Sequence, residues 1–408
     1  MNILYLNTTF QCGGAEKVTS QIFQGMRARG HEVYQIVSYD TRHSVLPEGV
    51  HVLYDSFFMR MFNRLISGNR SNTSLHISYS RQYILHFLKK HKIDLIHLHN
   101  PHDSFLGIKD IADLSRVCPV VWTLHDFWAM TGHCTYPHGC DDRWKSGCNT
   151  CERLGNYPAI RKDVAHTLWE AKKKAFADAR ITFTVPSDWM LTQFNCSYLA
   201  GKPCERIYNS LDTTIWKPLD KAALRAKHKI NPKTKILAFI AADPGKELKG
   251  MDYLLKALSL LPDPESYLLL IAGKDHPGLH TLNTKFQIRH WGYLNSQEQL
   301  NEFYSLADLL VNPSVYETFG LTNVEAMACG TPVAAFPVCT MPELITKASG
   351  WLAFDVSAES LADVIQLAFS SPQELRDKGI SSRHLVETTF DENNMLDQFE
   401  DLYERVLL

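Results

Sequence analysis

The sequence lacks any apolar run long enough to cross a membrane, and its start lacks the features of a secretion signal. A spanning helix needs about 18 or more predominantly apolar residues in succession, and no stretch of the 408 residues approaches that length. The opening MNILYLNTTF has no basic region before an apolar core and reads as a first strand. We therefore expect a cytoplasmic protein.

The chain also lacks a strong net charge and any basic stripe with interleaved aromatic residues. Its formal net charge is −2 at pH 7, and without such a stripe we expect no nucleic-acid partner. The charge is nevertheless uneven, because residues 1–208 carry 24 Lys and Arg against 18 Asp and Glu. This positive half is a hint about partners, with chance variation between two surfaces as the alternative.

What the sequence does contain is an alternation of short apolar runs with segments of helical length. A first series of runs is NILYL, VYQIV, DLIHL, VVWTL and ITFTV, and a second is KILAFIA, YLLLIAG, LLVNPS and PVAAF. Strands that alternate with helices predict parallel sheets covered on both faces. We therefore predict an α/β protein with two Rossmann-like domains that face a cleft.

The alternation of predicted strands and helices is interrupted at residues 208–233, which contain two prolines. We place an N-terminal domain at residues 1–208, with a Cys-rich insertion at 133–151, and a C-terminal domain at 209–390. Residues 391–408 should form a closing helix that returns to the N-terminal domain. Its apolar positions keep helical spacing and are Met395, Phe399, Leu402 and Val406.

Residues 315–333, VYETFGLTNVEAMACGTPV, place two carboxylates beside a turn and a helix start. Ligands of open α/β sheets bind beyond the carboxyl ends of strands, and LLVNPS is the strand before this segment. Free amides at a helix start form an anion site, which Gly320 would open to close approach. Glu317 and Glu325 would contact other parts of the ligand. As an isolated pair, they would more simply be a surface loop residue and a partner of the helix dipole.

The order of residues in this segment resembles the donor-site signature of retaining GT-B glycosyltransferases of family 4. Four more motifs are similar to that family: CGGAEK at 12–17, TLHD at 123–126, YNSLD at 208–212 and LKGMDYLLKAL at 248–258. The similarity covers both domains, and the motifs are far more specific together than singly. It implies a GT-B fold and transfer of a sugar from a nucleotide-diphosphate sugar, with retention at the anomeric carbon.

In the C-terminal domain, the resemblance implies a donor site. Lys249 would pair with phosphate oxygens and neutralise the leaving group, and Glu317 and Glu325 would hold the donor sugar and the ribose. Tyr293 stands where a family loop contacts the base, although an ordinary strand-end aromatic explains it nearly as well. The diphosphate would lie on the helix-start amides of Phe319, Gly320, Leu321 and Thr322.

In the N-terminal domain, the resemblance implies that Gly13 and Gly14 let the backbone approach the diphosphate and the transferred sugar. His125 would face that sugar and the acceptor, and Asp126 would orient His125. A further group of histidines at a strand end looks like a metal cluster, but packed strand-end histidines are commoner, and we assign no metal to them. They are His97, His99 and His102.

One position departs from the family pattern. The family usually has an arginine about six residues before the Lys of Lys-Gly, and this chain has Asp243 there. A carboxylate beside a diphosphate would repel it. Lys246 is the substitute for the missing arginine that the sequence offers.

Ten cysteines in a chain expected in the cytoplasm argue against a disulfide framework. Four of them follow the spacing C-x5-C-x7-C-x2-C, which suits tetrahedral zinc, and His133 or His138 could replace one. The segment looks like an insertion of some bacterial polysaccharide-type members of the family, and a metal staple would order a loop without a core. Adventitious cysteines or one labile disulfide are the alternatives. The four predicted zinc ligands are Cys134, Cys140, Cys148 and Cys151.

Residues 57–70, FFMRMFNRLISGNR, contain an apolar stripe at helical spacing and three arginines without any acid. A basic, aromatic-rich amphipathic helix suits the surface of an anionic membrane. The commoner alternative is a helix whose stripe packs on its own sheet. On the membrane interpretation, the protein would be peripheral on the inner membrane face, and the acceptor would be a lipid-linked glycan.

The function predicted from the sequence is therefore a retaining hexosyltransferase that acts on a nucleotide sugar and a glycan or lipid-linked glycan, in bacterial surface polysaccharide synthesis. The chain has no Asp-x-Asp motif, in agreement with the family expectation that the chemistry requires no metal or cofactor. One alternative is a nucleotide-sugar epimerase or hydrolase on the same fold. The other is an inactive, zinc-stapled protein that binds glycans.

Overall fold

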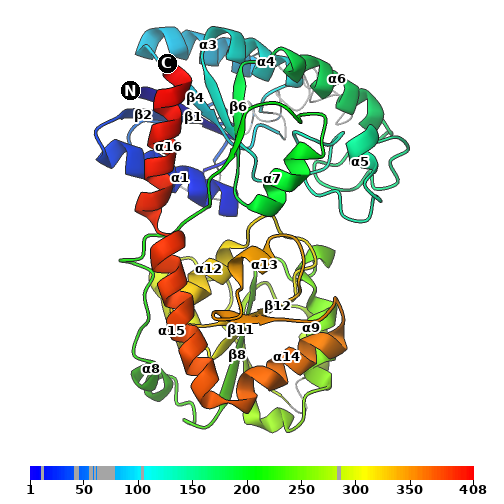
Figure 1. Cartoon of the computed structure of the whole chain (residues 1–408), viewed down its shortest axis with the longest axis vertical. Helices are drawn as coiled ribbons and strands as arrows, with labels where there is room; N and C mark the ends of the chain where they lie inside the picture. The colour runs from blue at the N-terminus through cyan, green and yellow to red at the C-terminus, as the bar shows by residue number, and fades with distance from the viewer. Residues whose placement is uncertain are drawn as a thin grey trace. The chain divides into compact units, whose positions relative to one another are not determined.

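The computed structural model contains two compact units. The N-terminal unit comprises Met1–Tyr208 and Leu396–Leu408, and the C-terminal unit comprises Asn209–Met395. Figure 1 shows both, coloured by residue number. The residues described are 1–10, 13–40, 46–54, 58, 61, 79–102, 105–282 and 286–408.

The N-terminal unit is built on a parallel sheet in the order β3-β2-β1-β4-β5-β6-β7. Ile3 to Leu6 are buried one after another, and successive strand side chains point to opposite faces, so both faces of the sheet are covered. The strands are β1 (Asn2–Asn7), β2 (Glu32–Val37), β3 (Val50–Val52), β4 (Leu95–Leu98), β5 (Val120–Thr123), β6 (Ile181–Val185) and β7 (Cys204–Arg206).

Helices connect these strands, and the last helix of the chain packs on the same unit. On α16, the predicted apolar positions Phe399 and Leu402 are buried, and Tyr403 reaches His97 of β4, with 2.6 Å between the hydroxyl and Nδ1. The helices are α1 (Gly14–Ala28), α3 (Tyr79–His91), α4 (Ile108–Val117), α5 (Arg143–Ser146), α6 (Ala165–Ala177), α7 (Asp188–Asn195) and α16 (Glu392–Leu407).

The C-terminal unit has a second parallel sheet, in the order β10-β9-β8-β11-β12-β13. Its strands are β8 (Lys235–Ala241), β9 (Tyr267–Gly273), β10 (Gln287–His290), β11 (Leu309–Asn312), β12 (Val333–Ala335) and β13 (Gly350–Leu352). Its helices are α8 (Lys221–Lys227), α9 (Met251–Ser259), α10 (Pro277–Leu282), α11 (Gln297–Leu306), α12 (Leu321–Ala328), α13 (Met341–Leu344), α14 (Ala358–Ser370) and α15 (Pro372–Thr389), with short 3-10 helices at Glu247–Lys249 and Pro264–Ser266.

Each sheet has a point at which the strand order reverses. In the N-terminal unit the chain builds outward from β1 in one direction and from β4 in the other, and in the C-terminal unit the reversal lies between β8 and β11. Ligands of open α/β sheets bind outside the carboxyl ends of the strands at such a point. The loops after β1, β4, β8 and β11 are therefore where a site is expected.

The structure confirms the α/β class and the two Rossmann-like sheets. It adds four strands of three or four residues, β3, β7, β10 and β13, which the alternation of apolar runs did not indicate. The predicted amphipathic helix at 57–70 lies outside the described residues except for Phe58 and Met61, whose exposed fractions are 75% and 44%. No helix within the described residues is long and apolar enough to cross a membrane.

Candidate functional site

In the C-terminal unit, the Lys-Gly element brings the loop after β8 against the loop after β11. Gly250 has φ +65°, and a Cβ there would lie 1.9 Å from the carbonyl oxygen of Pro313, so only glycine permits this approach. The N–H of Val315 also donates to the carbonyl of Leu248 at 3.0 Å. The two loops at the switch point are thus joined through their backbones.

This contact places Lys249 and Glu317 side by side, as Nζ of Lys249 donates to Oε2 of Glu317 at 2.8 Å. The side chains are 36% and 17% exposed, so the pair remains accessible to a ligand. The two residues lie 68 positions apart in the sequence. The tertiary structure therefore brings together the side chain predicted to bind phosphate, Lys249, and the side chain predicted to bind the sugar, Glu317.

Helix α12 begins at Leu321, shortly after Glu317 in the sequence. Its N-cap residue, Gly320, has φ +91° and provides no side-chain cap, and Leu321 and Thr322 are partly exposed. The aromatic ring of Phe319 is buried and packs edge-on against Phe390, with ring centroids 5.9 Å apart. Any contact of Phe319 with a ligand would consequently be made by its backbone and not by its ring.

Glu325 and Tyr293 occupy different environments. Glu325 is buried on α12 and accepts a hydrogen bond from the hydroxyl of Tyr304 at 2.7 Å, so α11 holds this carboxylate in place. Tyr293 lies in the loop after β10 with 47% of its surface exposed. Its contact with a base stays a prediction.

Asp243, the residue that departs from the family pattern, lies on the loop after β8. Its carboxylate pairs with Nζ of Lys274, from the loop after β9, at 3.0 Å, and the hydrogen bond from Lys274 lowers the pKa of Asp243 below its ordinary value. The negative charge that was expected to repel a diphosphate is therefore balanced. Lys246, the predicted substitute for the missing arginine, is exposed on the same loop, two residues before Leu248.

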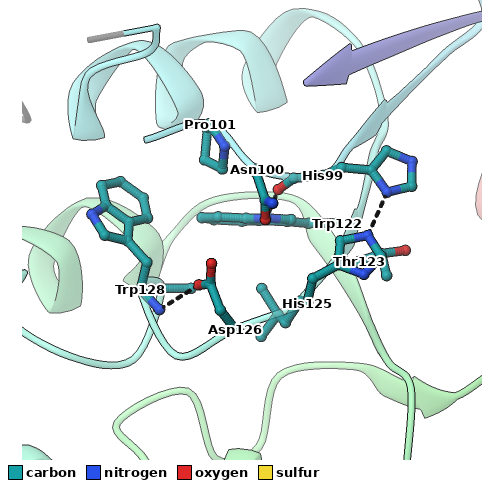
Figure 2. A pocket seen from close by; sticks show the side chains of 10 residues that line it. His99, Asn100, Pro101, Trp122, Thr123, His125, Asp126 and Trp128 are labelled. Atoms are coloured by element: carbon teal, nitrogen blue, oxygen red, sulfur yellow. Dashed lines mark hydrogen bonds between the residues drawn. The ribbon is translucent and has the colours of Figure 1, made fainter. Parts of the chain in front are cut away.

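In the N-terminal unit, the loops after β4 and β5 line a small cavity (Figure 2). His125 lies on its wall and is hydrogen-bonded to His99, with 2.9 Å between Nε2 of His125 and Nδ1 of His99. Both rings are buried. Burial lowers the pKa of His125 to about 4 and that of His99 well below its ordinary value. Both imidazoles are therefore neutral near pH 7.

Asp126 is held by different neighbours. Its Oδ1 accepts from the backbone N–H of Trp128 at 2.8 Å (Figure 2), and its Oδ2 accepts from Nε2 of His102 at 3.0 Å. His125 is therefore hydrogen-bonded to His99, while Asp126 pairs with His102, and the orientation of His125 by Asp126 stays a prediction. Two of the three strand-end histidines, His99 and His102, thus contact the two residues of the His-Asp segment.

The glycine-rich turn after β1 carries a carboxylate that has no predicted role. Glu16 follows Gly13 and Gly14 at the start of α1, and a Cβ on Gly13 would lie 2.6 Å from Oε2 of Glu16. Burial raises the pKa of Glu16, and His102 opposes that shift. The turn, Glu16 and His102 therefore belong to one polar region at the switch point of this unit.

The four predicted zinc ligands line one cavity together with His133. Nε2 of His133 lies 3.5 Å from Sγ of Cys151, and its Nδ1 is bonded to the carbonyl of Pro158. Among the described residues, however, no group of three or more His, Cys, Asp or Glu side chains is arranged so that it could hold a metal ion. Zinc binding would therefore require the sulfur atoms to move closer together.

The Cys-rich loop is also not without a core of its own, which corrects one premise of the zinc prediction. Trp144 is buried, packs edge-on against Phe127 with ring centroids 5.2 Å apart, and accepts at its carbonyl from Nε1 of Trp169 at 2.8 Å. These contacts join the loop to the His-Asp segment and to α6. Apolar packing therefore orders part of the loop.

A buried lysine of α6 fastens the same region. Nζ of Lys172 donates to the carbonyls of Trp128, Thr131 and Gly132 and lies 3.7 Å from the ring centroid of Trp128. Burial lowers its pKa to about 7. Lys172 thus holds the chain between Asp126 and the first cysteine of the cluster. Its place in a helix with no adjacent motif left no sequence signal for this role.

Two family models match the chain. The model described as Glycosyltransferase Family 4 matches residues 12–215, and the model described as Glycosyl transferases group 1 matches residues 220–383. Together they span both units.

A curated relative and two solved structures agree with these matches. WcaC of Escherichia coli (strain K12), assigned as a colanic acid biosynthesis glycosyl transferase, is 28% identical over 90% of this chain and 90% of its own. Sucrose-phosphate synthase from Thermosynechococcus elongatus has a TM-score of 0.76 at 18% identity, covering 99% of this chain and 98% of its own. Anabaena Alr3699/HepE, solved with UDP, has a TM-score of 0.71 at 18% identity, covering 99% and 100%.

Proposed function

The chain belongs to glycosyltransferase family 4, and on this basis we propose that it transfers a hexose from a nucleotide-diphosphate sugar to a glycan, with retention at the anomeric carbon. The C-terminal unit would bind the donor and the N-terminal unit the acceptor. Support for the donor class comes from the Anabaena structures, which contain UDP, UDP together with glucose, or UDP-glucose.

The observation that carries the proposal is the Lys249–Glu317 pair at the switch point beside the start of α12. A diphosphate placed on the amides of Gly320 to Thr322 would attract the ammonium of Lys249, which would exchange part of its contact with Glu317 for a phosphate oxygen. Glu317 would then be released toward a hydroxyl of the donor sugar. In the absence of the donor substrate, the two side chains that would bind it are thus paired with each other.

The chemistry would be mainly electrostatic. As the bond between the anomeric carbon and the diphosphate oxygen breaks, negative charge grows on the leaving group, and Lys249, Lys246 and the helix-start amides would stabilise it. The acceptor hydroxyl would attack from the same face and pass its proton to the leaving diphosphate. No protein nucleophile and no divalent metal are required in this scheme.

The relative named for colanic acid biosynthesis supports a surface polysaccharide as the product. The acceptor would then be a growing glycan or a lipid-linked glycan. His125 would meet its hydroxyls and those of the transferred sugar. Gly13 and Gly14 would let the backbone approach the transferred sugar, because they carry no side chain there.

Incubating the full chain with a panel of nucleotide sugars, with and without bacterial glycan lipids, tests the proposal. We expect thermal stabilisation by one nucleotide sugar and release of its nucleotide that depends on the acceptor. Product analysis should show an α-linkage from an α-donor. Nucleotide release at the same rate without any acceptor would favour a hydrolase, formation of an epimer would favour an epimerase, and the absence of any nucleotide binding would favour a glycan-binding protein.

A structural zinc ion on Cys134, Cys140, Cys148 and Cys151 is a second, separate proposal. Its support is that four thiols of one loop line one cavity, and binding would require their sulfur atoms to close around the ion. Elemental analysis of protein purified without added metal should find about one zinc per chain, lost in Cys148→Ser but retained in Cys196→Ser, whose cysteine is exposed outside the loop. Metal-free protein with four alkylatable thiols would refute it.

Peripheral contact with an anionic membrane is the third part of the proposal. Phe58 and Met61 of the basic segment 57–70 are exposed, as a membrane-facing stripe requires. The wild-type protein should sediment with anionic liposomes at low salt and be released at high salt, and Arg60→Glu/Arg64→Glu should not bind. Equal recovery of both proteins in the supernatant at low salt would remove membrane contact from the proposal.

A further inference from the structure

The hydrogen bond between His99 and His125 determines which ring nitrogen of His125 carries the proton. In the parallel ladder, His97 of β4 stands opposite Val121 of β5, so His99 and His125 follow adjacent strands at the same edge. Their rings are nearly parallel, at 15° with centroids 5.2 Å apart, and 2.9 Å separates Nδ1 of His99 from Nε2 of His125. Figure 2 shows this bond beside the cavity.

Two neutral imidazoles can share one hydrogen bond in only two ways. Either Nδ1–H of His99 donates to Nε2 of His125, or Nε2–H of His125 donates to Nδ1 of His99. In the second case the proton of His99 must sit on its own Nε2. The two cases therefore differ in what the far nitrogen of His99 carries, a lone pair or a hydrogen.

The surroundings of that far nitrogen distinguish the two cases. Nε2 of His99 is fully buried and has no hydrogen-bond partner within the described part of the chain. The His99 ring packs against those of Tyr5 and His97, with centroids 6.2 Å and 4.1 Å away. A buried N–H without an acceptor is rarer in proteins than a buried acceptor without a donor. The arrangement therefore favours a bare Nε2 and a proton on Nδ1 of His99.

The neighbouring pair shows the same pattern where the direction is not in question. Nε2 of His102 faces the carboxylate of Asp126, which accepts hydrogen bonds when ionised, so His102 must donate from Nε2. Its other nitrogen, Nδ1, is buried and also lacks a partner among the described residues. In the neutral form of His102, the nitrogen without a partner is again the one that carries no proton.

We propose that His99 is a positioning residue that holds His125 in its Nδ1–H form, so that His125 is a hydrogen-bond donor from Nδ1 and no acceptor there. A donor at this place suits a sugar oxygen that carries negative charge or a lone pair, and it prevents His125 from removing a proton through Nδ1. This inference rests on the proposed function for its kinetic consequence. The tautomer itself can be measured without any substrate.

Three replacements of His99 separate donation from mere packing. The amide nitrogen of His99→Asn can stand near the position of Nδ1 and donate as it does. His99→Asp places an acceptor there and should force His125 into the Nε2–H form. His99→Leu removes the partner and adds no charge, which keeps the test decisive where a buried carboxylate prevents folding.

The measurement is a two-bond 1H–15N spectrum of the full chain labelled at histidine, with His125→Gln used to identify the signals of His125. We expect the Nδ1–H form in the wild type and in His99→Asn, the Nε2–H form in His99→Asp, and a mixture in His99→Leu. Turnover should fall roughly 100-fold in His99→Asp and less than about 10-fold in His99→Asn, on the scale of one lost oriented hydrogen bond.

An Nε2–H form of His125 in the wild type would overturn the proposal, as would a His99→Leu spectrum identical to the wild type. A wild-type protein that transfers no sugar from any donor would instead contradict the proposed function and leave the tautomer result unaffected. Circular dichroism of each variant shows whether its fold is retained. Equal turnover of the Asn and Leu variants would reduce His99 to a packing residue.

Discussion

The two units place candidate residues at corresponding points of similar parallel sheets but use different chemistry there. At the switch point of the C-terminal unit lie charged, partly exposed pairs, Lys249–Glu317 and Asp243–Lys274. The switch point of the N-terminal unit carries hydrogen-bonded histidines, and every buried histidine among the described residues belongs to that unit. Paired charges suit a diphosphate, and hydrogen-bonded imidazoles beside the carboxylates Glu16 and Asp126 suit hydroxyl groups. The difference therefore supports donor binding by one unit and acceptor binding by the other.

The largest effect is expected at the charged switch point. Lys249→Ala and Glu317→Ala should each lower turnover by about 100-fold or more, because each removes a positioned electrostatic contact. Steady-state kinetics measures the loss, and thermal unfolding should change little since the pair is partly exposed. Lys227→Ala is the matched control, because Lys227 also pairs with a glutamate of the same unit, Glu302, at 2.6 Å. Turnover like that of the wild type in either site variant would contradict the donor assignment.

Mild acid should destabilise the N-terminal unit more than the C-terminal unit. The pKa of His97, His99 and His125 is lowered by burial, to about 4 for His125, against about 6.5 when unfolded. Between these values the unfolded chain binds more protons, so stability is complete above about pH 6.5 and is lost as the pH falls toward 4. Burial raises the pKa of Asp110 to about 6 and also raises that of Glu16, which offsets part of this loss at lower pH.

Peptide-resolved hydrogen exchange, corrected for the intrinsic rate, should therefore show reduced protection of the N-terminal unit at pH 5.5 relative to pH 7.5. The C-terminal unit, whose described histidines are not buried, should change less. Equal loss of protection in both units would show that the buried histidines do not control acid stability.

A smaller effect on stability is expected from the buried lysine beside the His-Asp segment. Lys172→Met leaves the carbonyls of Trp128, Thr131 and Gly132 without this donor, at a cost of about 1–3 kcal/mol of unfolding free energy. Lys174→Met, on the exposed side of the same helix, should cost much less. Urea unfolding compares the two, and equal midpoints would mean that the loop is held by Trp144 and its neighbours alone.

Comparable and smaller effects, on donor binding, concern the buried carboxylate of α12 and the hydroxyl that holds it. Glu325→Ala should weaken donor binding by about 1–3 kcal/mol, the range of a lost charge-assisted hydrogen bond. Tyr304→Phe removes only the hydroxyl that holds Glu325 and should weaken binding by about 0.5–1.5 kcal/mol. Calorimetric titration with the donor measures both. A larger loss in Tyr304→Phe than in Glu325→Ala would contradict direct contact of Glu325 with the donor.

Sequence reasoning found the α/β fold because its signals are local. Apolar runs of strand length between helical segments predicted β1, β2, β4, β5, β6 and the central strands of the second sheet, all of which are present. The edge strands β3 and β13 have only three residues each, too few to show a pattern. Their pairing depends on the neighbouring strand and not on their own residues.

The sequence by itself determined the fold class, the family and the loops that carry the candidate residues, because short motifs with glycine at defined places require particular backbone turns. Only the tertiary structure decided which side chains meet. Strand register brings His99 to His125 across 26 residues, and the contact of Gly250 with Pro313 brings Lys249 to Glu317 across 68. Burial then lowers the pKa of His99 and of His125, because burial depends on all the elements packed around the two rings and on no single segment of the chain.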